Sequence, residues 1–278
     1  MTNNITSLSG YIQTVSERVQ TFGLSNSTTT PWFRGQSDLN WKLIPHIHRI
    51  TGLGGYERDL IRDFKLLSHN ILQQHKLENE FDWLYVMQHY GLPTRLLDWT
   101  ESSLVALFFA VQDFQYETDA AVWVFSPRLF NLMILKVTNT VPTSDYHDLE
   151  KYIITRPDFA EREVKAKLPI ALRPSMNSPR ILAQRGVFTI HGNLPKCIND
   201  IVNEMNINAY PILEKIVIDG KSKLKLLKEL YLSGISHSVI FPELIGITQE
   251  LRHRYSIDFL GKDNWEFPFE NNLSNFNG

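Results

Sequence analysis

Residues 32–36, Trp-Phe-Arg-Gly-Gln, combine a cation with aromatic and small residues in a pattern that suits an anionic ligand. On a strand flanked by aromatics, Arg34 would direct its guanidinium into a cleft, and Gly35 would leave room for a ligand close to the backbone. The segment therefore predicts a phosphate or ribose clamp at Arg34. The alternative is that Arg34 belongs to a partly buried ion pair.

Residues 88–103, Gln-His-Tyr-Gly-Leu-Pro-Thr-Arg-Leu-Leu-Asp-Trp-Thr-Glu-Ser-Ser, form a denser group of polar and aromatic side chains. Their hydroxyls lie near a predicted helix start, where unpaired N–H groups attract anions, so a pyrophosphate would be stabilised there. The alternative is a helix cap with a buried pair between Arg95 and Asp98 that holds the loop. His89 could transfer a proton, or it could simply pack against Tyr90.

Residues 180–190 contain a third candidate, Gln184, which stands next to Arg185-Gly186 at the mouth of a predicted strand. Its amide could hydrogen-bond sugar hydroxyls through both its donor and its acceptor atoms, but it cannot act as a general base. The alternative is an amide that satisfies backbone groups of the loop.

Several familiar chemistries have no matching motif in the sequence. There is no metalloprotease helix motif, no Gly-x-Ser-x-Gly elbow and no zinc-type cysteine pairing. Gly220-Lys221-Ser222 ends like a phosphate-binding loop, but Lys215 stands where that loop needs its first glycine. No further ligand lies at suitable spacing from His46 and His48, so we expect no metal.

The elements that would position these residues follow from hydrophobic spacing. We expect helices over residues 5–19, 56–71, 81–91, 101–111 and 221–231, and strands over 120–125, 133–137, 187–191 and 212–218. In the second helix Leu60, Phe64, Leu67 and Ile71 would share one apolar face. The sequence predicts an α+β fold with N-terminal helices packed on a mixed, mainly antiparallel β-sheet, as one domain over 1–261 followed by a polar tail over 262–278.

Composition limits the classes of partner. The 278 residues are 43% hydrophobic, and 28 basic against 30 acidic residues give a formal charge of −2, so no global positive field gathers nucleic acid. The single cysteine and an N-terminus unlike a secretory signal predict a cytoplasmic protein. The longest apolar run, residues 104–111, is far below the roughly 20 residues of a membrane span, so we expect no membrane contact.

Taken together, these segments resemble the FRG domain, a bacterial family named after its Phe-Arg-Gly signature. The matching pieces are residues 32–36 with the following Trp41 and Pro45, 88–100 leading into 106–110, and 184–188, with Gly234-Ile235 and Phe241-Pro242 further on. The resemblance spans about residues 31–244.

The order of the segments is also similar to the ADP-ribosyltransferase layout, a weaker resemblance. It implies that Arg34 anchors the phosphate or ribose of NAD and that Thr100, with Ser102 or Ser103, steadies the site. Gln184 stands where that layout has a glutamate that bonds the ribose 2′-hydroxyl. We therefore expect Arg34, Thr100, Ser102 and Gln184 to be the catalytic group.

The glutamine is a departure with chemical consequences. Breaking the nicotinamide–ribose bond passes through a sugar cation, so a nearby negative charge should lower the barrier. Gln184 carries none, so the charge would come from another acid, such as Asp98, Glu101 or Glu243.

Aromatic and polar side chains near the motifs complete the expected ligand contacts. Trp32 and Trp99 could stack on nicotinamide, adenine or a target base. The residues expected to bind NAD are Trp32, Gly35, Gln36, His89, Tyr90, Arg95, Asp98, Trp99 and Ser103.

Three functions remain open on sequence alone. The first is an enzyme that cleaves NAD as its substrate and transfers ADP-ribose to a nucleic-acid base or a protein, as a toxin or anti-phage effector with an antitoxin or another defence-system protein as partner. The second is a non-catalytic module that binds a nucleotide or nucleic acid through Arg34, Arg95 and the tryptophans. The third is a protein-interaction domain in which the motifs are structural.

Overall fold

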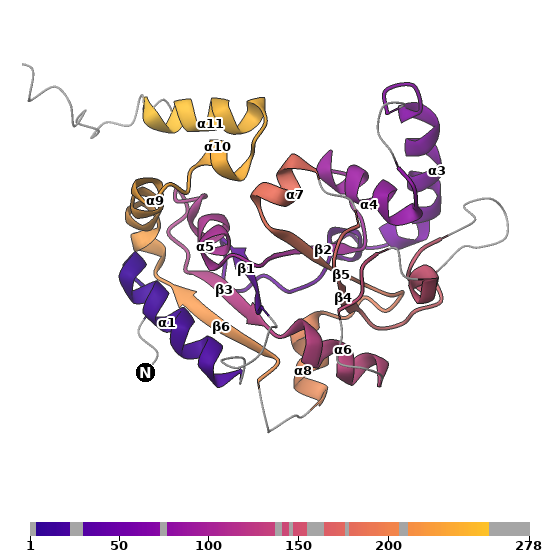
Figure 1. Ribbon diagram of the computed structural model, residues 1–278, viewed down its shortest axis with the longest axis horizontal. Helices are drawn as coiled ribbons and strands as arrows, with labels where there is room; N and C mark the ends of the chain where they lie inside the picture. The colour runs from indigo at the N-terminus through magenta and orange to yellow at the C-terminus, as the bar shows by residue number, and fades with distance from the viewer. Residues whose placement is uncertain are drawn as a thin grey trace, which may run out of the picture.

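The computed structural model describes residues 4–22, 30–72, 77–136, 141–144, 147–154, 164–175, 178–205 and 211–255. Its centre is a six-stranded sheet in the order β4-β5-β2-β1-β3-β6, in which all neighbours are antiparallel (Figure 1). The strands are β1 Trp32–Gln36, β2 Leu96–Thr100, β3 Ala120–Phe125, β4 Ile170–Leu172, β5 Gly186–Ile190 and β6 Leu213–Ile218.

Helices surround this sheet and make the fold α+β, as predicted. They are α1 Leu8–Thr21, α2 His46–Arg49, α3 Glu57–Ser68, α4 Glu80–His89, α5 Ser103–Val111, α6 Pro127–Leu135, α7 Pro179–Ala183, α8 Ile198–Met205, α9 Lys223–Leu232, α10 His237–Ile240 and α11 Leu244–Arg254. Short 3₁₀ turns occupy Leu53–Tyr56, His147–Tyr152 and Gly220–Ser222. No helix in these parts of the chain is long and apolar enough to cross a bilayer.

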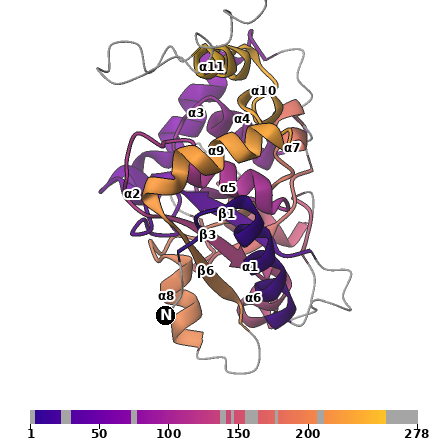
Figure 2. The same ribbon diagram turned by 90° about the vertical axis from the view of Figure 1, so that its left-hand side faces the viewer.

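Three apolar clusters hold the layers together. The helices α1, α5 and α9 share one cluster with β1, β3 and β6, and Figures 1 and 2 show α1 and α9 on the same side of the sheet. A second cluster joins α3 and α4 to β4 and β5. The third contains Trp32, Trp99 and Phe125 together with residues of α6 and α8. Both sheet faces are therefore covered, and an opening for a ligand has to form at a discontinuity.

That discontinuity lies between β1 and β2. Their register is limited to Phe33↔Thr100, whereas β2 and β5 pair from Leu96↔Ile190 to Thr100↔Gly186. Beyond Phe33 the two strands part, so the β4-β5-β2 half of the sheet separates from the β1-β3-β6 half. The side chain of Arg34 follows directly after the last pair.

The packing of α5 against β1 explains the small residues that the sequence places there. A Cβ atom on Gly35 would lie 1.8 Å from the carbonyl oxygen of Ala106 and 2.7 Å from the nitrogen of Ala110. Gly35 therefore makes room for the α5 backbone. This corrects the expectation that it leaves room for a ligand, although Gly35 also borders the cavity described below.

The predicted elements differ from the structure in three places. The strand expected over 133–137 is wrong, because residues up to Leu135 belong to α6, which begins with Pro127 at a favoured helix position. No strand was predicted over Leu96–Thr100, which forms β2 with Asp98 exposed among buried neighbours. The helix expected over 56–71 forms as α3, but Leu67 and Ile71 are 83% and 78% exposed. The polar tail over 262–278 lies outside the described residues.

Candidate functional site

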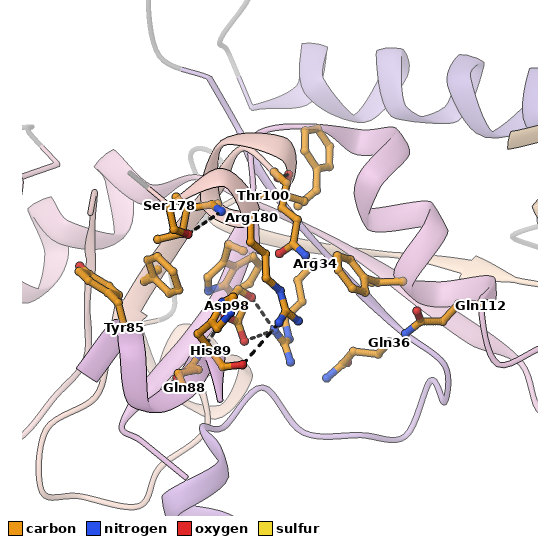
Figure 3. Close-up of a pocket in the computed structure, with 18 of the residues that line it drawn as sticks. Arg34, Gln36, Tyr85, Gln88, His89, Asp98, Thr100, Gln112, Ser178 and Arg180 are labelled. Atoms are coloured by element: carbon orange, nitrogen blue, oxygen red, sulfur yellow. Dashed lines mark hydrogen bonds and ion pairs between the residues drawn. The ribbon is translucent and has the colours of Figure 1, made fainter. Parts of the chain in front are cut away.

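A cavity of about 930 Å³ opens where β1 and β2 part. Residues of β1, β2, α4 and α7 line it, together with the start of β5 and the turn before α11 (Figure 3). Its charged side chains include the arginines Arg34, Arg49 and Arg180 and the carboxylates Asp98, Asp113 and Glu243. A cavity with both signs of charge can bind an anion and also supply a base.

Arg34 reaches across the gap between the separated strands. Its Nη1 donates to the backbone oxygen of Asp98 at 2.5 Å and lies 3.9 Å from the carboxylate atom Oδ2 of the same residue. The side chain is 17% exposed, and its Nε has no hydrogen-bond partner among the described residues. Burial lowers the pKa of Arg34 to about 10, with Asp98 opposing and Arg49 adding to the shift. The guanidinium is therefore charged at neutral pH and has a donor left for a ligand.

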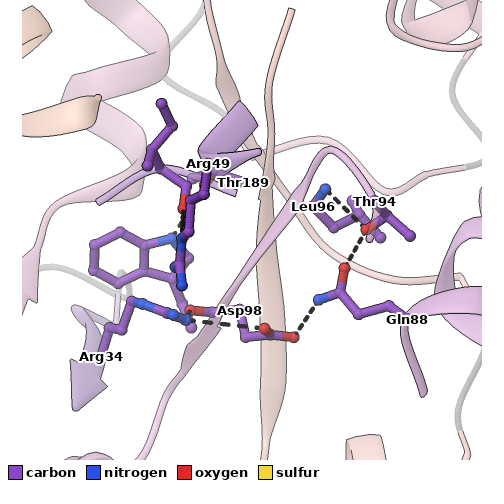
Figure 4. A network of polar contacts seen from close by, with 9 residues as sticks. Arg34, Arg49, Gln88, Thr94, Leu96, Asp98 and Thr189 are labelled. Atoms are coloured by element: carbon purple, nitrogen blue, oxygen red, sulfur yellow. Dashed lines mark hydrogen bonds and ion pairs between the residues drawn. The ribbon is translucent and has the colours of Figure 1, made fainter. Parts of the chain in front are cut away.

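Asp98 is held at the cavity by a short chain of side chains (Figure 4). Gln88 Nε2 donates to Asp98 Oδ1 at 2.6 Å, and Gln88 Oε1 accepts a hydrogen bond from the Thr94 hydroxyl. The backbone N–H of Leu96 in turn donates to Thr94 Oγ1 at 3.2 Å. The Asp98 side chain is nonetheless 61% exposed, so this carboxylate is oriented and accessible at once.

Thr100 and Gln184 meet at the same cavity as Arg34, although Gln184 is 84 residues further along the chain than Thr100. The Thr100 hydroxyl donates to the backbone oxygen of Gln184 at 2.6 Å and accepts from the N–H of Ser102 at 3.0 Å. Gln184 Nε2 donates to the backbone oxygen of Ile240 at 3.2 Å. Both side chains thus donate to backbone carbonyls, which for the Gln184 amide is the alternative to binding a ligand.

His89 and Arg180 form another edge of the cavity. His89 Nε2 lies 3.4 Å from Glu243 Oε1, and its ring makes an edge contact with Tyr90 at 4.8 Å. Burial lowers the pKa of His89, with Arg180 acting in the same direction and Glu243 opposing. Arg180 donates to the backbone oxygen of His89 at 3.5 Å and lies 4.9 Å from the centre of the Phe241 ring. His89 is therefore neutral at pH 7.

Arg95 has a different place from the one expected. It is 4% exposed, pairs with Glu57 through two of its nitrogens, and donates to the backbone oxygen of His191 at 2.7 Å. It neither contacts Asp98 nor lines the cavity. The expectation that Arg95 binds a ligand is corrected, because its donors are consumed by a buried carboxylate and backbone carbonyls.

The tryptophans of the motifs are core residues. Trp32 is fully buried, 6.2 Å from Phe125, and does not line the cavity. Trp99 borders the cavity but is 3% exposed, stacks on Phe125 at 4.7 Å and donates to Thr189 Oγ1. Stacking of a ligand on Trp32 is therefore excluded by burial, and Trp99 presents little surface.

Two expected hydroxyls lie away from the cavity. The Ser102 side chain caps α5 by accepting from the N–H of Val105, and the Ser103 carbonyl accepts from the Tyr11 hydroxyl at 2.7 Å. Neither serine lines the cavity, so the predicted anion site at this helix start is not formed. Thr100 alone of the three hydroxyl residues reaches the site.

The three acids that could supply negative charge, Asp98, Glu101 and Glu243, lie at different places relative to the cavity. Glu101 pairs with Arg173 at 2.5 Å outside the cavity, and Glu243 faces His89. Asp113 accepts from Ser37 Oγ at 2.5 Å. Asp98 is therefore the carboxylate that lies beside Arg34. Within the described ranges, no cluster of three His, Cys, Asp or Glu residues could hold a metal ion.

Sequence reasoning missed part of the cavity lining. Trp41 and Arg180 belong to segments that the motifs include, but no role was predicted for them. Gln112 carries no local signal, because it simply follows the apolar run of α5. The remaining predicted residues Gly35, Gln36, His89, Tyr90, Asp98, Trp99 and Gln184 do line the cavity.

Comparison with known proteins assigns part of the chain to a family model. Residues 29–119 match the family model of the FRG domain. The matched segment includes β1, β2 and α5, and thus Arg34, Asp98 and Thr100, whereas Gln184 and Arg180 lie beyond it. No curated protein and no solved structure matches the chain.

Proposed function

This chain carries an FRG domain, and from that premise we propose that the cavity between β1 and β2 binds NAD and transfers its ADP-ribose group to an acceptor. One observation carries the proposal. Arg34 on β1, Thr100 on β2 and Gln184 just before β5 line a single cavity, and the register Phe33↔Thr100 and Thr100↔Gly186 makes the three strands neighbours. These are the three residues that the resemblance to the ADP-ribosyltransferase layout names.

Binding of the dinucleotide would rest on the arginines. Arg34 is charged at neutral pH and retains an unpartnered Nε among the described residues. The guanidinium groups of Arg49 and Arg180 line the same cavity and would add to the attraction for a diphosphate. Trp41, which is 50% exposed, and Phe109 supply ring surface in the walls.

The chemical step would use Asp98. The bond between ribose C1′ and the nicotinamide nitrogen breaks, its electron pair leaves with nicotinamide, and the cationic sugar is stabilised by the Asp98 carboxylate. A nucleophilic atom of the acceptor then bonds to C1′, and Asp98 takes the proton that this atom loses. Asp98 thus supplies the charge that Gln184 lacks.

The proposal is tested by nicotinamide release from NAD by the full chain. Arg34→Gln should lower release about 100-fold or more, because the anchoring charge is lost while a polar side chain remains. Arg62→Gln is the matched control, since Arg62 is 46% exposed on α3 and does not line the cavity. Equal release by wild type and Arg34→Gln would overturn the proposal.

A non-catalytic nucleotide-binding module is the second candidate. The observation that favours it is that the Thr100 hydroxyl and the Gln184 amide both donate to backbone carbonyls. It predicts NAD binding that depends on Arg34, weakens with salt and proceeds without nicotinamide release. The acceptor class, the toxin or anti-phage role and a defence-system partner stay predictions from the sequence.

A further inference from the structure

Gln36 has a fixed orientation in the wall of the cavity. Trp123 Nε1 donates to Gln36 Oε1 at 2.7 Å. An indole nitrogen can only donate, so the amide oxygen must face Trp123 and the NH₂ group must point away from it. Gln36 is 2% exposed, and its Nε2 has no hydrogen-bond partner among the described residues. A buried donor in this state needs an acceptor, and Gln36 lines the cavity.

A second amide, that of Gln112, lines the same cavity. Ser37 Oγ donates to Asp113 Oδ2 at 2.5 Å, which ties the residue after Gln36 to the residue after Gln112. Figure 3 shows Gln36 and Gln112 on the same side of the cavity, opposite Ser178 and Tyr85. The Gln112 amide has both donor and acceptor atoms and can rotate to hydrogen-bond either an acceptor or a donor of a ligand.

Ring surface is available at the same cavity. Trp41 lines the cavity and is 50% exposed. Phe109 also lines it, one turn of α5 before Gln112, the residue that follows the helix. Exposed aromatic faces bind flat rings by stacking. Amides that flank such a surface read the polar edge of the ring.

We propose that the Gln36 end of the cavity binds a flat heteroaromatic ring through an exocyclic carbonyl group, which accepts from Gln36 Nε2. The inference rests on the proposed function, since it assigns part of the same substrate site. Two sources share this chemistry: the nicotinamide of NAD, and a nucleobase with a carbonyl edge as acceptor. A ring with an amino group at that position could not accept from Gln36 Nε2, because both groups are donors, and it should bind more weakly.

Pairs of small probes that differ mainly in this group test the inference by calorimetric titration of the full chain. The pairs are uridine against cytidine, inosine against adenosine, and nicotinamide against 3-aminopyridine. The carbonyl member of at least one pair should bind about tenfold tighter or more. A nucleoside preference identifies the source as an acceptor base, and a preference confined to nicotinamide identifies it as the leaving ring of NAD.

Gln36→Glu sharpens the test because a carboxylate still accepts from Trp123 but presents an oxygen where the NH₂ group was. The preference in the responding pair should reverse in favour of the amino probe. Gln20→Glu introduces the same charge on an exposed position of α1 and should leave the preference unchanged. Reversal cannot arise from misfolding, which would weaken both probes together.

Two results overturn the inference: equal binding of both members in every pair by wild type, or a preference that Gln36→Glu leaves intact. These results are separate from the test of the proposed function. Nicotinamide release that depends on Arg34 can occur without any probe preference, and the preference can occur without release.

Discussion

At the scale of single residues, two arginines from the matched segment have opposite roles. Arg34 is charged, partly accessible and retains an unpartnered nitrogen among the described residues, whereas Arg95 spends its donors on Glu57 and on backbone carbonyls. A buried charge pair of this kind is costly to break, so Arg95 holds the fold. Only the partners of each side chain, not its type or neighbours in sequence, separate the two roles.

Asp98 carries the first prediction. If its carboxylate stabilises the sugar cation, Asp98→Asn should lower nicotinamide release about 100-fold or more, because the charge is lost and the shape is kept. NAD binding should be unchanged or tighter, since Arg34 loses a competing anion 3.9 Å away. Release kinetics and calorimetric binding measure the two effects.

Gln88→Leu tests the positioning of the same carboxylate. The change removes the donor at 2.6 Å from Asp98 and should reduce the rate of release by less than Asp98→Asn does. Asp63→Asn, on the outer side of α3, is the control for loss of an exposed carboxylate. A rate for Asp98→Asn equal to wild type would remove Asp98 from the mechanism.

At the scale of elements, the site depends on how β1 fits between α5 and the gap to β2. Gly35 lets the α5 backbone approach β1, and this holds the neighbouring Arg34 and Gln36 at the cavity. The single register pair with β2 leaves room that a fully paired sheet would close. The close packing of β1 against α5 and the missing pairs between β1 and β2 thus together place Arg34 and Gln36 at the cavity.

Gly35→Ala is the prediction at this scale. The added methyl would lie 1.8 Å from the Ala106 carbonyl oxygen, so β1 or α5 must move. We expect the free energy of unfolding to fall by about 3 kcal/mol, at the upper end of overpacking effects. Urea denaturation of Gly35→Ala measures this, and Gly54→Ala, whose Cβ would meet no atom within 4 Å, is the matched control. Equal stabilities would show that the close approach is not constrained.

At the scale of the whole molecule, a buried ionisable residue that the proposed reaction does not use, His191, directly follows β5. His191 is fully buried, and neither ring nitrogen has a partner in the described part of the chain. Burial holds the pKa of His191 well below 6.5, and His48, Arg95 and Arg34 act in the same direction. Burial also lowers the pKa of the neighbouring His48.

Stability should therefore decrease in mild acid. Below about pH 6.5 an unfolded histidine binds a proton that folded His191 does not. The contribution of neutral His191 to the free energy of unfolding is therefore complete above this pH and is lost as the pH falls. One such group contributes at most about 1.4 kcal/mol per pH unit. Urea denaturation at pH 7 and pH 5 should give a smaller loss for His191→Gln than for wild type. An equal loss would assign the acid sensitivity to other groups.

Most of the α+β organisation was predictable from local pattern. The apolar spacing of residues 56–71, 101–111 and 221–231 marks α3, α5 and α9, because a helix repeats every 3.6 residues. The same reasoning failed at residues 133–135, where a short apolar run suits a strand or a buried helix equally. It also missed β2, whose exposed Asp98 interrupts an otherwise buried strand.

The sequence by itself determined which residue types are available: an arginine in an aromatic segment, a glutamine where a glutamate was expected, and a family signature over residues 29–119. Tertiary structure decided which of them share a cavity. Hydrogen-bond partners and burial assigned Arg95, Trp32, Ser102 and Ser103 to the framework and left Arg34, Asp98 and Gln36 at the opening. These assignments depend on which distant segments meet in space: Arg34 and Gln184 are 150 residues apart and line one cavity, and no local pattern encodes that meeting.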